Sequence, residues 1–454
     1  MDKNYAIVLG AGRSGLSATK ALTTIKNCYV YLYDENDNIN KDNIKKYLPD
    51  DSTYELRLSD ITEEEINQIK ICVISPGFPK YKEIVKKLKD NNVPIISEIE
   101  LGYIISKGLI CCVTGSNGKT TVTSLVGEIL KTRYNDVHIC GNIGVPFCEE
   151  SLRTNDQSVS CIELSSFQLE DIKDFKPHVA AIINISPDHL DRYDSYEYYI
   201  QAKLNIAVNQ SKSDVLILNY DDVVLRELSK KKNLFKSKIV YFSSTQKLPQ
   251  GFYLENRNIM FADGSKTYKV LNVDDLILKG MHNYENVMAS IAMSYYMDVP
   301  FENIVDTCKK FKSLPHRIEF VRNKNGIKFY NDSKATNPDS TIKAINAIDG
   351  KIILIAGGRD KHFDYGDLIV RVKERVKNLV LIGESKKIIA NKCKVMNYSN
   401  VLFADTLIEA VNIAVTYANV GDNVLLSPAC SSLDMFKNYE DRGNQFKEIV
   451  MSLK

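Results

Sequence analysis

The stretch CCVTGSNGKTTVTSL spans residues 111–125 and indicates a strand, a glycine turn and a helix in direct succession. Its apolar run ends at Gly115, and the residues that follow place Leu125 and Ile129 on one face of the expected helix. Backbone N–H groups of such a turn, the helix dipole and a lysine charge together attract an anion. The spacing departs from G-x-x-x-x-G-K-[ST], because Val113 takes the place of its first glycine. We therefore expect a shortened phosphate loop, with an ordinary turn as the alternative.

Length, charge and cysteine usage limit the class of protein. The chain has 454 residues, of which 44% are hydrophobic, and this length suggests about two to four domains with buried cores. Lys and Arg number 59 against 57 Asp and Glu, so the net charge of +2 provides no field for nucleic acid or an anionic membrane. Ten cysteines without a C-x-x-C pair indicate reduced thiols, and no apolar stretch reaches the ~18 residues of a membrane span. We expect a cytoplasmic monomer with small-molecule partners, without nucleic acid or membrane.

The N-terminal region has the pattern of a dinucleotide-binding fold. A strand at residues 5–9 leads into GAGRSG at 10–15, and a second strand ends before Asp34, where such folds place a ribose-binding acid. A third strand ends at Ser75, at the same expected sheet edge. NAD is one interpretation, and the fold also serves many other ligands. For Asp34 and the neighbouring Glu35, a polar strand end is the alternative to a ligand contact.

The central region carries acidic and histidyl residues at expected strand ends. Glu163 and His189 each follow an apolar strand, at the edge where the phosphate loop opens. Carboxylate, imidazole and a threonine hydroxyl would together complete two Mg²⁺ shells, and the alternative is a capped loop. Lys203 lies on a helix and by itself predicts a surface lysine. Asn283 precedes a long apolar helix, for which it is either a ligand contact or a cap.

The C-terminal region adds a second α/β layer. Arg317 follows a linker after a helix, where its guanidinium can reach phosphate or ribose when domains close. Asp332 and Lys334 flank one turn after a strand, and a helix is expected to begin near Thr341. Another strand leads into the glycine-rich loop at residues 357–361. We expect ligand loops to gather on one edge of this sheet.

Seven motifs together give the chain a recognisable pattern: TGSNGKTT, ELSSFQL, DHLDR, GMHNYEN, NDSKATN, AGGRDK and LSPACSSLDMFKN. They resemble the Mur ligase family, particularly its D-glutamate-adding members, and the resemblance runs from the first glycines to the C-terminus. It implies an α/β fold of three domains: a Rossmann-like UDP-substrate domain at 1–105, a central P-loop ATPase-like domain with a mostly parallel sheet at 106–313, and a Rossmann-like amino-acid domain at 314–454.

The resemblance also implies a role for individual residues. ATP would contact Gly115, Ser116, Asn117, Gly118, Lys119, Thr120, Thr121, Asn283, Arg317 and Asp332. Two Mg²⁺ ions would be held by Thr120, Glu163, His189 and Lys203, the last as a carbamate derived from CO₂. The UDP-bearing substrate would contact Ser14, Asp34, Glu35, Ser75, Gly77 and Asn142, and D-glutamate would contact Thr336, Lys361, Ser432, Leu433 and Tyr439. Catalysis would depend on Lys119, His189, Lys203 and Lys334.

The implied reaction is ATP-dependent amide formation. ATP would phosphorylate the terminal carboxylate of UDP-N-acetylmuramoyl-L-alanine, and the amine of D-glutamate would then displace phosphate. The sequence leaves the proton acceptor open between His189 and a neighbouring carboxylate. The alternatives are a Mur-type or folylpolyglutamate-type ligase for another amino acid, and a non-catalytic nucleotide-binding sensor of the same fold.

Overall fold

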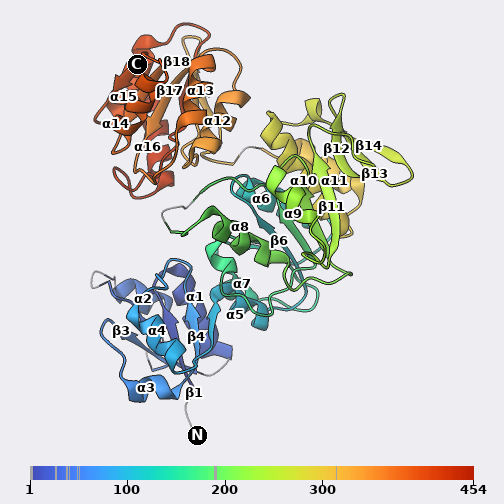
Figure 1. Cartoon of the computed structure of the whole chain (residues 1–454), viewed down its shortest axis with the longest axis vertical. Helices are drawn as coiled ribbons and strands as arrows, with labels where there is room; N and C mark the ends of the chain where they lie inside the picture. Colours follow the sequence, from blue (N-terminus) through green and yellow to red (C-terminus); the bar gives the residue numbers. More distant parts are fainter. Residues whose placement is uncertain are drawn as a thin grey trace. The chain divides into compact units, whose positions relative to one another are not determined.

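The structure is a computed structural model, and it describes residues 4–25, 28–36, 39, 41–48, 50, 52–188, 192–312 and 314–453. The described residues form two compact units, each treated by itself below. The first lies within Met1–Ile185, Glu197–Leu271 and Asn286–Cys308, and the second within Ser186–Tyr196, Asn272–Glu285 and Lys309–Lys454. Three sheets carry the fold (Figure 1).

The N-terminal sheet belongs to the first unit and is entirely parallel, in the order β3-β2-β1-β4-β5. Its strands are β1 (Asn4–Leu9), β2 (Cys28–Tyr33), β3 (Tyr54–Arg57), β4 (Ile69–Ile74) and β5 (Ile95–Ser97). Its helices are α1 (Arg13–Ile25), α2 (Lys41–Tyr47), α3 (Glu63–Gln68), α4 (Glu83–Asp90) and α5 (Glu98–Ile105). Alternate residues of β1 enter opposite cores, since Ala6 and Val8 lie in one cluster and Ile7 and Leu9 in the other. Helices therefore cover both faces, as a Rossmann-like fold requires.

The central sheet has nine strands in the order β14-β13-β12-β11-β10-β9-β6-β8-β7. Its strands are β6 (Leu109–Thr114), β7 (Val137–Gly141), β8 (Val159–Glu163), β9 (Val179–Ile182), β10 (Val215–Asn219), β11 (Lys238–Ser243), β12 (Gln250–Glu255), β13 (Asn258–Asp263) and β14 (Thr267–Asn272). Its helices are α6 (Lys119–Leu130), α7 (Phe147–Ser151), η1 (Phe167–Leu169), α8 (Tyr196–Leu204), η2 (Asn205–Ala207), α9 (Val223–Ser229), η3 (Val273–Asp275), α10 (Met281–Tyr296) and α11 (Phe301–Lys310). The pairs from β7 to β12 are parallel, and β12 pairs with β13 in antiparallel fashion.

The C-terminal sheet lies in the second unit, in the order β15-β16-β20-β17-β18-β19. Its strands are β15 (Glu319–Lys324), β16 (Ile327–Asn331), β17 (Ile352–Gly357), β18 (Val376–Ile382), β19 (Val401–Phe403) and β20 (Asn423–Leu426), and its helices are α12 (Pro338–Ala347), α13 (Gly366–Arg375), α14 (Lys386–Val395), α15 (Leu407–Tyr417) and α16 (Tyr439–Ser452). Only the pair β15–β16 is antiparallel among the described strands of this sheet. Alternate residues of β17 again enter two cores, one under α12–α14 and one under α15 and α16.

The α/β fold with mostly parallel sheets is confirmed, and several details differ from expectation. Helix α12 begins at Pro338 instead of near Thr341, because Asn337 caps it by accepting from the N–H of Ser340 and proline suits the first helical position. Helix α10 begins at Met281, inside the GMHNYEN motif. Hairpin-like pairing, predicted around Asp263 and Gly264, extends further, because β12 also pairs with β13 through a turn at 256–257. The three domain boundaries stay a prediction.

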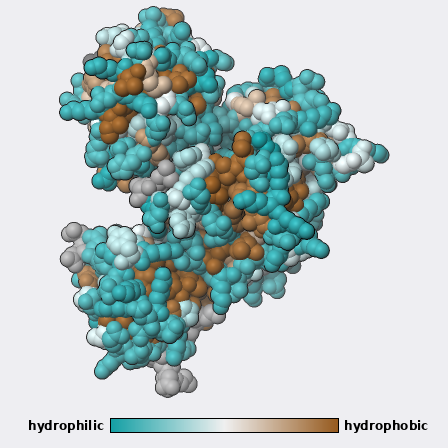
Figure 2. Space-filling view, viewed as in Figure 1, coloured by the Kyte–Doolittle hydropathy of each residue, from teal (hydrophilic) through white to brown (hydrophobic). Residues whose placement is uncertain are grey.

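The burial of the cysteines and the hydropathy of the surface are those expected of a chain whose apolar residues are buried in separate cores. All ten cysteines are free thiols, and only Cys28 is partly accessible while the other nine are buried. None of the helices in the described part of the chain has the length and hydropathy needed to cross a bilayer. On the face seen in Figure 2, hydrophilic residues predominate and apolar residues form separate patches.

The glycine turn after β1 requires glycine for a steric reason. A Cβ atom at Gly15 would lie 1.7 Å from the carbonyl oxygen of Gly10, whereas a Cβ atom at Gly12 would meet no atom within 4 Å. Close packing of α1 on β1 therefore depends on the third glycine of the motif and leaves the second free to face a ligand.

We expect Gly15→Ala to lower the free energy of unfolding by at least about 2 kcal/mol, because backbone must move to admit the methyl group. The matched variant Gly12→Ala should change it by no more than about 1 kcal/mol. Urea unfolding followed by circular dichroism measures both. Equal stability of the two variants would contradict the steric argument.

Candidate functional site

The phosphate loop joins β6 to α6 and is shaped by side chains from other elements. Gly115 and Gly118 have φ angles of +154° and +86°, which glycine adopts without strain. The Asn184 side chain accepts from the backbone N–H groups of Ser116 and Asn117, at 3.1 and 2.8 Å, and donates to the Asn117 carbonyl at 2.9 Å. One asparagine therefore fixes the loop before any ligand binds.

Two lysines converge on the same carbonyl oxygen of this loop. Lys119 Nζ donates to the Gly115 carbonyl at 2.9 Å, and Lys203 Nζ donates to the same oxygen at 2.8 Å. The Lys203 side chain is only 1% exposed, and its amine lies 4.6 Å from the ring centroid of Tyr199. The Tyr199 hydroxyl in turn lies 2.9 Å from Ser116 Oγ. The prediction of a surface lysine at position 203 is therefore wrong.

A buried carboxylate stands at the end of the next strand. Glu163 ends β8, which pairs in parallel with β6, so its side chain and the phosphate loop share one edge of the sheet. It is 1% exposed; Oε1 accepts from Asn142 Nδ2 at 2.7 Å, and Oε2 is buried without a hydrogen-bond partner among the described residues. An unsatisfied buried carboxylate oxygen suits a hard divalent cation.

Of the other predicted metal ligands at this sheet edge, the structure describes the threonines but not His189. Thr120 and Thr121 lie in the first turn of α6, directly after Lys119. His189 lies outside the described residues, and the described part of the chain contains no group of three or more His, Cys, Asp or Glu arranged for a metal. Glu163 is therefore the residue on which the fit of Mg²⁺ can be judged here, and its unpartnered oxygen fits.

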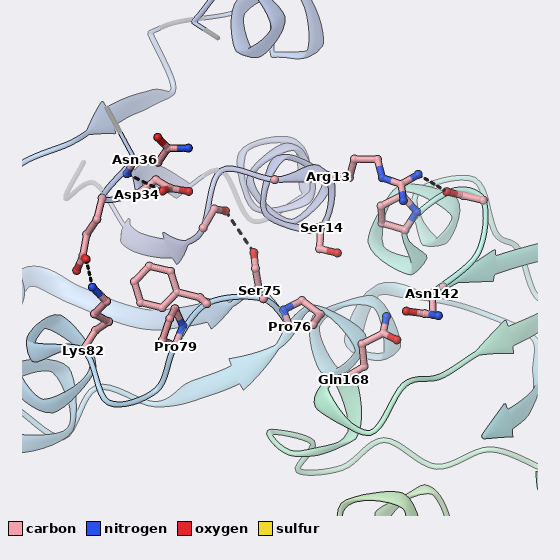
Figure 3. Close-up of a pocket in the computed structure, with 18 residues that line it drawn as sticks. Arg13, Ser14, Asp34, Asn36, Ser75, Pro76, Pro79, Lys82, Asn142 and Gln168 are labelled. Atoms are coloured by element: carbon pink, nitrogen blue, oxygen red, sulfur yellow. Dashed lines mark hydrogen bonds and ion pairs between the residues drawn. The ribbon is translucent and has the colours of Figure 1, made fainter. Parts of the chain in front are cut away.

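A cavity of about 670 Å³ lies in the first unit, between the N-terminal and central sheets (Figure 3). The residues proposed for the UDP-bearing substrate all line it: Ser14, Asp34, Glu35, Ser75, Gly77 and Asn142. Asn142 is also the donor to Glu163, so this cavity adjoins the edge of the central sheet. The cavity thus joins residues 10–82 of the N-terminal region to residues 141–168 of the central region.

Charged groups at the cavity already have protein partners. Asp34 Oδ2 accepts from Ala11 N–H at 2.7 Å, so this carboxylate holds the glycine turn in place. Lys82 pairs with Glu35 at 2.5 Å, and Arg13 Nη1 donates to the Gly144 carbonyl at 3.3 Å (Figure 3). Asp34 therefore has a structural role at the end of its strand, and this role is compatible with contact to a ligand in the cavity. Lys82 and Arg13 add two cations that the sequence analysis did not single out.

In the second unit, three loops leave the carboxyl ends of the adjacent parallel strands β16, β20 and β17. The buried Arg442 guanidinium ties two of them together: it donates to Ser333 Oγ and the Ser333 carbonyl at 2.9 and 2.8 Å, and to the Cys430 carbonyl at 3.2 Å. Burial lowers the pKa of Arg442 to about 10. The five-donor fork of arginine suits such bridging of carbonyls.

The residues predicted for D-glutamate are distributed over these loops. Lys334 Nζ lies 3.6 Å from the ring centroid of Tyr439, a cation–π contact that orients the amine. Ser432 is buried, Thr336 and Lys361 are partly exposed, and Leu433 is 56% exposed. The structure places all five on the loop side of one sheet.

Asp332 and His282 are titratable groups in the second unit whose pKa values burial displaces. Burial raises the pKa of Asp332 to about 7, although Ser427 Oγ donates to its carboxyl group at 2.7 Å and the N–H of Ile318 at 3.2 Å. Burial lowers the pKa of His282 to about 4, and the nearby Lys343 and Arg317 act in the same direction. At neutral pH the His282 imidazole is therefore uncharged.

The sequence analysis assigned no role to Asn286 or Asn184, whose side chains lie against the phosphate loop. A Cβ at Gly118 would lie 2.3 Å from Asn286 Oδ1, so the last asparagine of the GMHNYEN motif packs against the phosphate loop. Asn283 lies in the first turn of α10, after its start, and donates to the Lys279 carbonyl at 2.9 Å; the cap interpretation is wrong. Asn184 follows β9 by two residues, and that position at a strand end was a usable signal.

The comparisons with known proteins found matching families and relatives that together span the whole chain. Residues 113–294 match the Mur ligase middle domain, and residues 316–430 match the Mur ligase, glutamate ligase domain. A UDP-N-acetylmuramoylalanine--D-glutamate ligase from Lachnoclostridium phytofermentans is 46% identical over 448 residues, 99% of this chain and 98% of the relative. A protein of the same name from Lachnospira eligens is 42% identical over 454 residues, 100% of both chains. The solved MurF ligase from Thermotoga maritima in complex with ADP has a TM-score of 0.58 at 17% identity and covers 84% of this chain and 95% of that one, which shows likeness of fold.

The raised pKa of Asp332 predicts a pH dependence of stability. Its folded pKa of about 7 exceeds the ordinary value of 3.8, so ionisation costs more in the folded state, and wild-type stability falls as pH rises through this window. Asp332→Asn does not ionise. We expect the free energy of unfolding of Asp332→Asn, relative to wild type, to increase between pH 4 and pH 7 by about 1.4 kcal/mol per pKa unit. Denaturant titrations at a series of pH values measure this, with exposed Asp367→Asn as the control; a flat difference at Asp332 would refute it.

Proposed function

The chain belongs to the Mur ligase family, and on that premise we propose that it is an ATP-dependent ligase that joins D-glutamate to UDP-N-acetylmuramoyl-L-alanine. Full-length identity of 46% and 42% to proteins named for this reaction supports the choice of substrates. The structural observation that carries the proposal is that Lys119 and Lys203 meet at the Gly115 carbonyl of the phosphate loop, while Glu163 ends the strand paired with β6 and a cavity of about 670 Å³ lies in the same unit. The product serves peptidoglycan precursor synthesis, which we place in the cytoplasm.

Phosphoryl transfer would take place at the phosphate loop. The γ-phosphoryl group of ATP passes to the substrate carboxylate and gives an acyl phosphate and ADP; the D-glutamate amine then attacks the acyl carbon, and phosphate leaves as the amide forms. Lys119, now bound to carbonyls of its own loop, is placed to exchange them for phosphate oxygens. Such a reaction needs positioning and charge neutralisation more than covalent help.

Two Mg²⁺ ions would neutralise phosphate charge, and this chain offers Glu163 Oε2, Thr120 and His189 to hold them. Lys203 would complete the set as a carbamate, formed when its neutral amine attacks CO₂ and releases one proton. Burial of Lys203 at the phosphate loop supports this assignment, because burial favours the neutral amine that reacts with CO₂.

The second unit would supply the amino-acid site. Lys361, Thr336, Ser432, Leu433 and Tyr439 belong to the loops of the sheet that we assign to D-glutamate, and Lys334 would meet an anionic group. Arg317, Asp332 and Asn283 belong to the same unit, and we propose that they contribute to ATP binding.

Lys119→Ala tests the assignment of the phosphate loop. We expect phosphate release with ATP, UDP-N-acetylmuramoyl-L-alanine and D-glutamate to fall by at least about 10²-fold, because a charge on the transferring group is lost. Lys131→Ala, at the other end of α6 and exposed, is the matched control and should keep wild-type activity. A wild-type protein that releases phosphate with another amino acid from a panel, and not with D-glutamate, would contradict the proposed substrate.

Lys203→Ala tests the carbamate. We expect it to be nearly inactive and to regain part of the rate with added acetate or formate, which can fill the vacated space with a carboxylate. Labelling with ¹³CO₂ gives an independent readout: the wild type should show a carbamate carbon resonance by NMR, and Lys203→Ala should not. Exposed Lys212→Ala should retain the signal and the rate. Full activity of Lys203→Ala in CO₂-depleted buffer would rule out the carbamate.

A further inference from the structure

Helix α5 begins with two buried carboxylates that the proposed reaction does not use. Glu98 is 1% exposed and Glu100 is 0% exposed, and both stand at the junction between the N-terminal and central sheets. Buried carboxylates are costly unless hydrogen bonds satisfy them. The partners of these two side chains are therefore informative.

Glu98 binds the start of another helix. Its Oε1 accepts from the backbone N–H of Cys148 at 2.6 Å, and Cys148 Sγ donates to the Glu98 carbonyl at 3.1 Å. Cys148 is the second residue of α7, whose own N-cap residue, Pro146, makes no side-chain cap. Glu98 thus provides from α5 the hydrogen-bond acceptor that α7 lacks locally.

Close packing reinforces this contact. A Cβ atom at Gly102, one turn along α5, would lie 2.5 Å from Cδ1 of Phe147, the first residue of α7. The two helices therefore approach so closely that only glycine fits at position 102. Together the carboxylate and the glycine fix the first turn of α7 against α5.

The chain just before α7 forms a wall of the substrate cavity. Gly141, Asn142, Gly144 and Pro146 line it, and Asn142, which is labelled in Figure 3, also donates to Glu163. A displacement of the first turn of α7 would be passed directly to this wall, since Pro146 precedes Phe147.

Glu100 likewise holds a second segment, residues 173–175, through hydrogen bonds to its backbone. Its carboxylate accepts from three consecutive backbone N–H groups, those of Lys173, Asp174 and Phe175, at 2.7 to 3.0 Å. Ser97 N–H also donates to the Asp171 carbonyl at 2.8 Å. The segment from 167 to 175 carries Gln168, which lines the same cavity.

We propose that Glu98 is a positioning residue for the UDP-substrate site, whose carboxylate holds α7 so that residues 141–146 form the cavity wall. The proposal rests on the proposed function, because it concerns affinity for the UDP-bearing substrate. Glu98 does not line the cavity, so its effect on the ligand is exerted through Cys148 and Pro146.

The charge of Glu98 makes this effect dependent on pH. Burial raises the pKa of Glu98 to about 7, and the groups that face it are the thiols of Cys148 and Cys140 and the hydroxyl of Tyr47. The ionised carboxylate accepts the Cys148 N–H more strongly than the protonated acid does. The wall is therefore held more firmly above neutral pH than below it.

Calorimetric titration of the full-length protein with UDP-N-acetylmuramoyl-L-alanine at pH 6 and pH 8 tests the proposal. We expect Glu98→Ala to raise Kd by about tenfold at pH 8, because a small displacement of groups that position a ligand weakens their contacts with it, and the phosphate-release assay should show an unchanged KM for D-glutamate. Glu98→Gln keeps an acceptor oxygen without charge; it should match wild type at pH 6 and lack the gain in affinity that wild type shows at pH 8. Gly102→Ala should weaken binding at both pH values.

Leu88→Ala on α4 is the matched control for stability, because this buried side chain belongs to a different core cluster. It should lower Tm and leave Kd unchanged. Unaltered Kd in Glu98→Ala, or the same pH profile in Glu98→Gln and wild type, would overturn the proposal. Failure of the wild type itself to bind the UDP-bearing substrate would instead contradict the proposed function.

Discussion

The carbonyl oxygen of Gly115 accepts hydrogen bonds from two lysine amines, so one backbone atom of the phosphate loop joins α6 to α8. Two ammonium groups at one carbonyl repel each other in a setting where burial weakens screening. In the proposed reaction an anion would relieve this repulsion, either a phosphate at Lys119 or a carbamate on Lys203. Glu163 Oε2 has no hydrogen-bond partner among the described residues and lies at the same sheet edge. A divalent cation would satisfy this oxygen.

Three polar side chains that are not among the predicted ligand contacts hold the loops of the candidate sites in place. Asn184 satisfies the backbone of the phosphate loop, Arg442 joins two loops of the second unit, and Glu100 holds three successive N–H groups. Each is buried or partly buried, and each makes several hydrogen bonds at once. Such networks cost desolvation but leave one loop conformation far more stable than its alternatives. Pre-organisation of this kind lowers the entropy that binding must supply.

The glycine-rich turn after β1 shows that a motif can specify a fold without specifying a ligand. Gly15 is required because α1 packs on the Gly10 carbonyl, and Asp34 is engaged by the Ala11 N–H of the same turn. Both residues satisfy a dinucleotide-binding pattern while serving the backbone. The ligand is decided by the cavity that this turn shares with Asn142 and Gln168 of the central sheet region.

The sequence by itself determined the local elements and the strand ends, because hydrophobic periodicity, glycine turns and caps act over a few residues. It indicated the parallel α/β layers, the phosphate loop, and Glu163 at the edge beside that loop. Only the tertiary structure decided that Lys203 is buried against Gly115, that Asn142 joins the cavity to Glu163, and that Glu98 caps a helix fifty residues away. These contacts join residues from 21 to 88 positions apart. Burial and hydrogen-bond partners of that kind depend on how whole elements pack, and no local pattern in the chain records it.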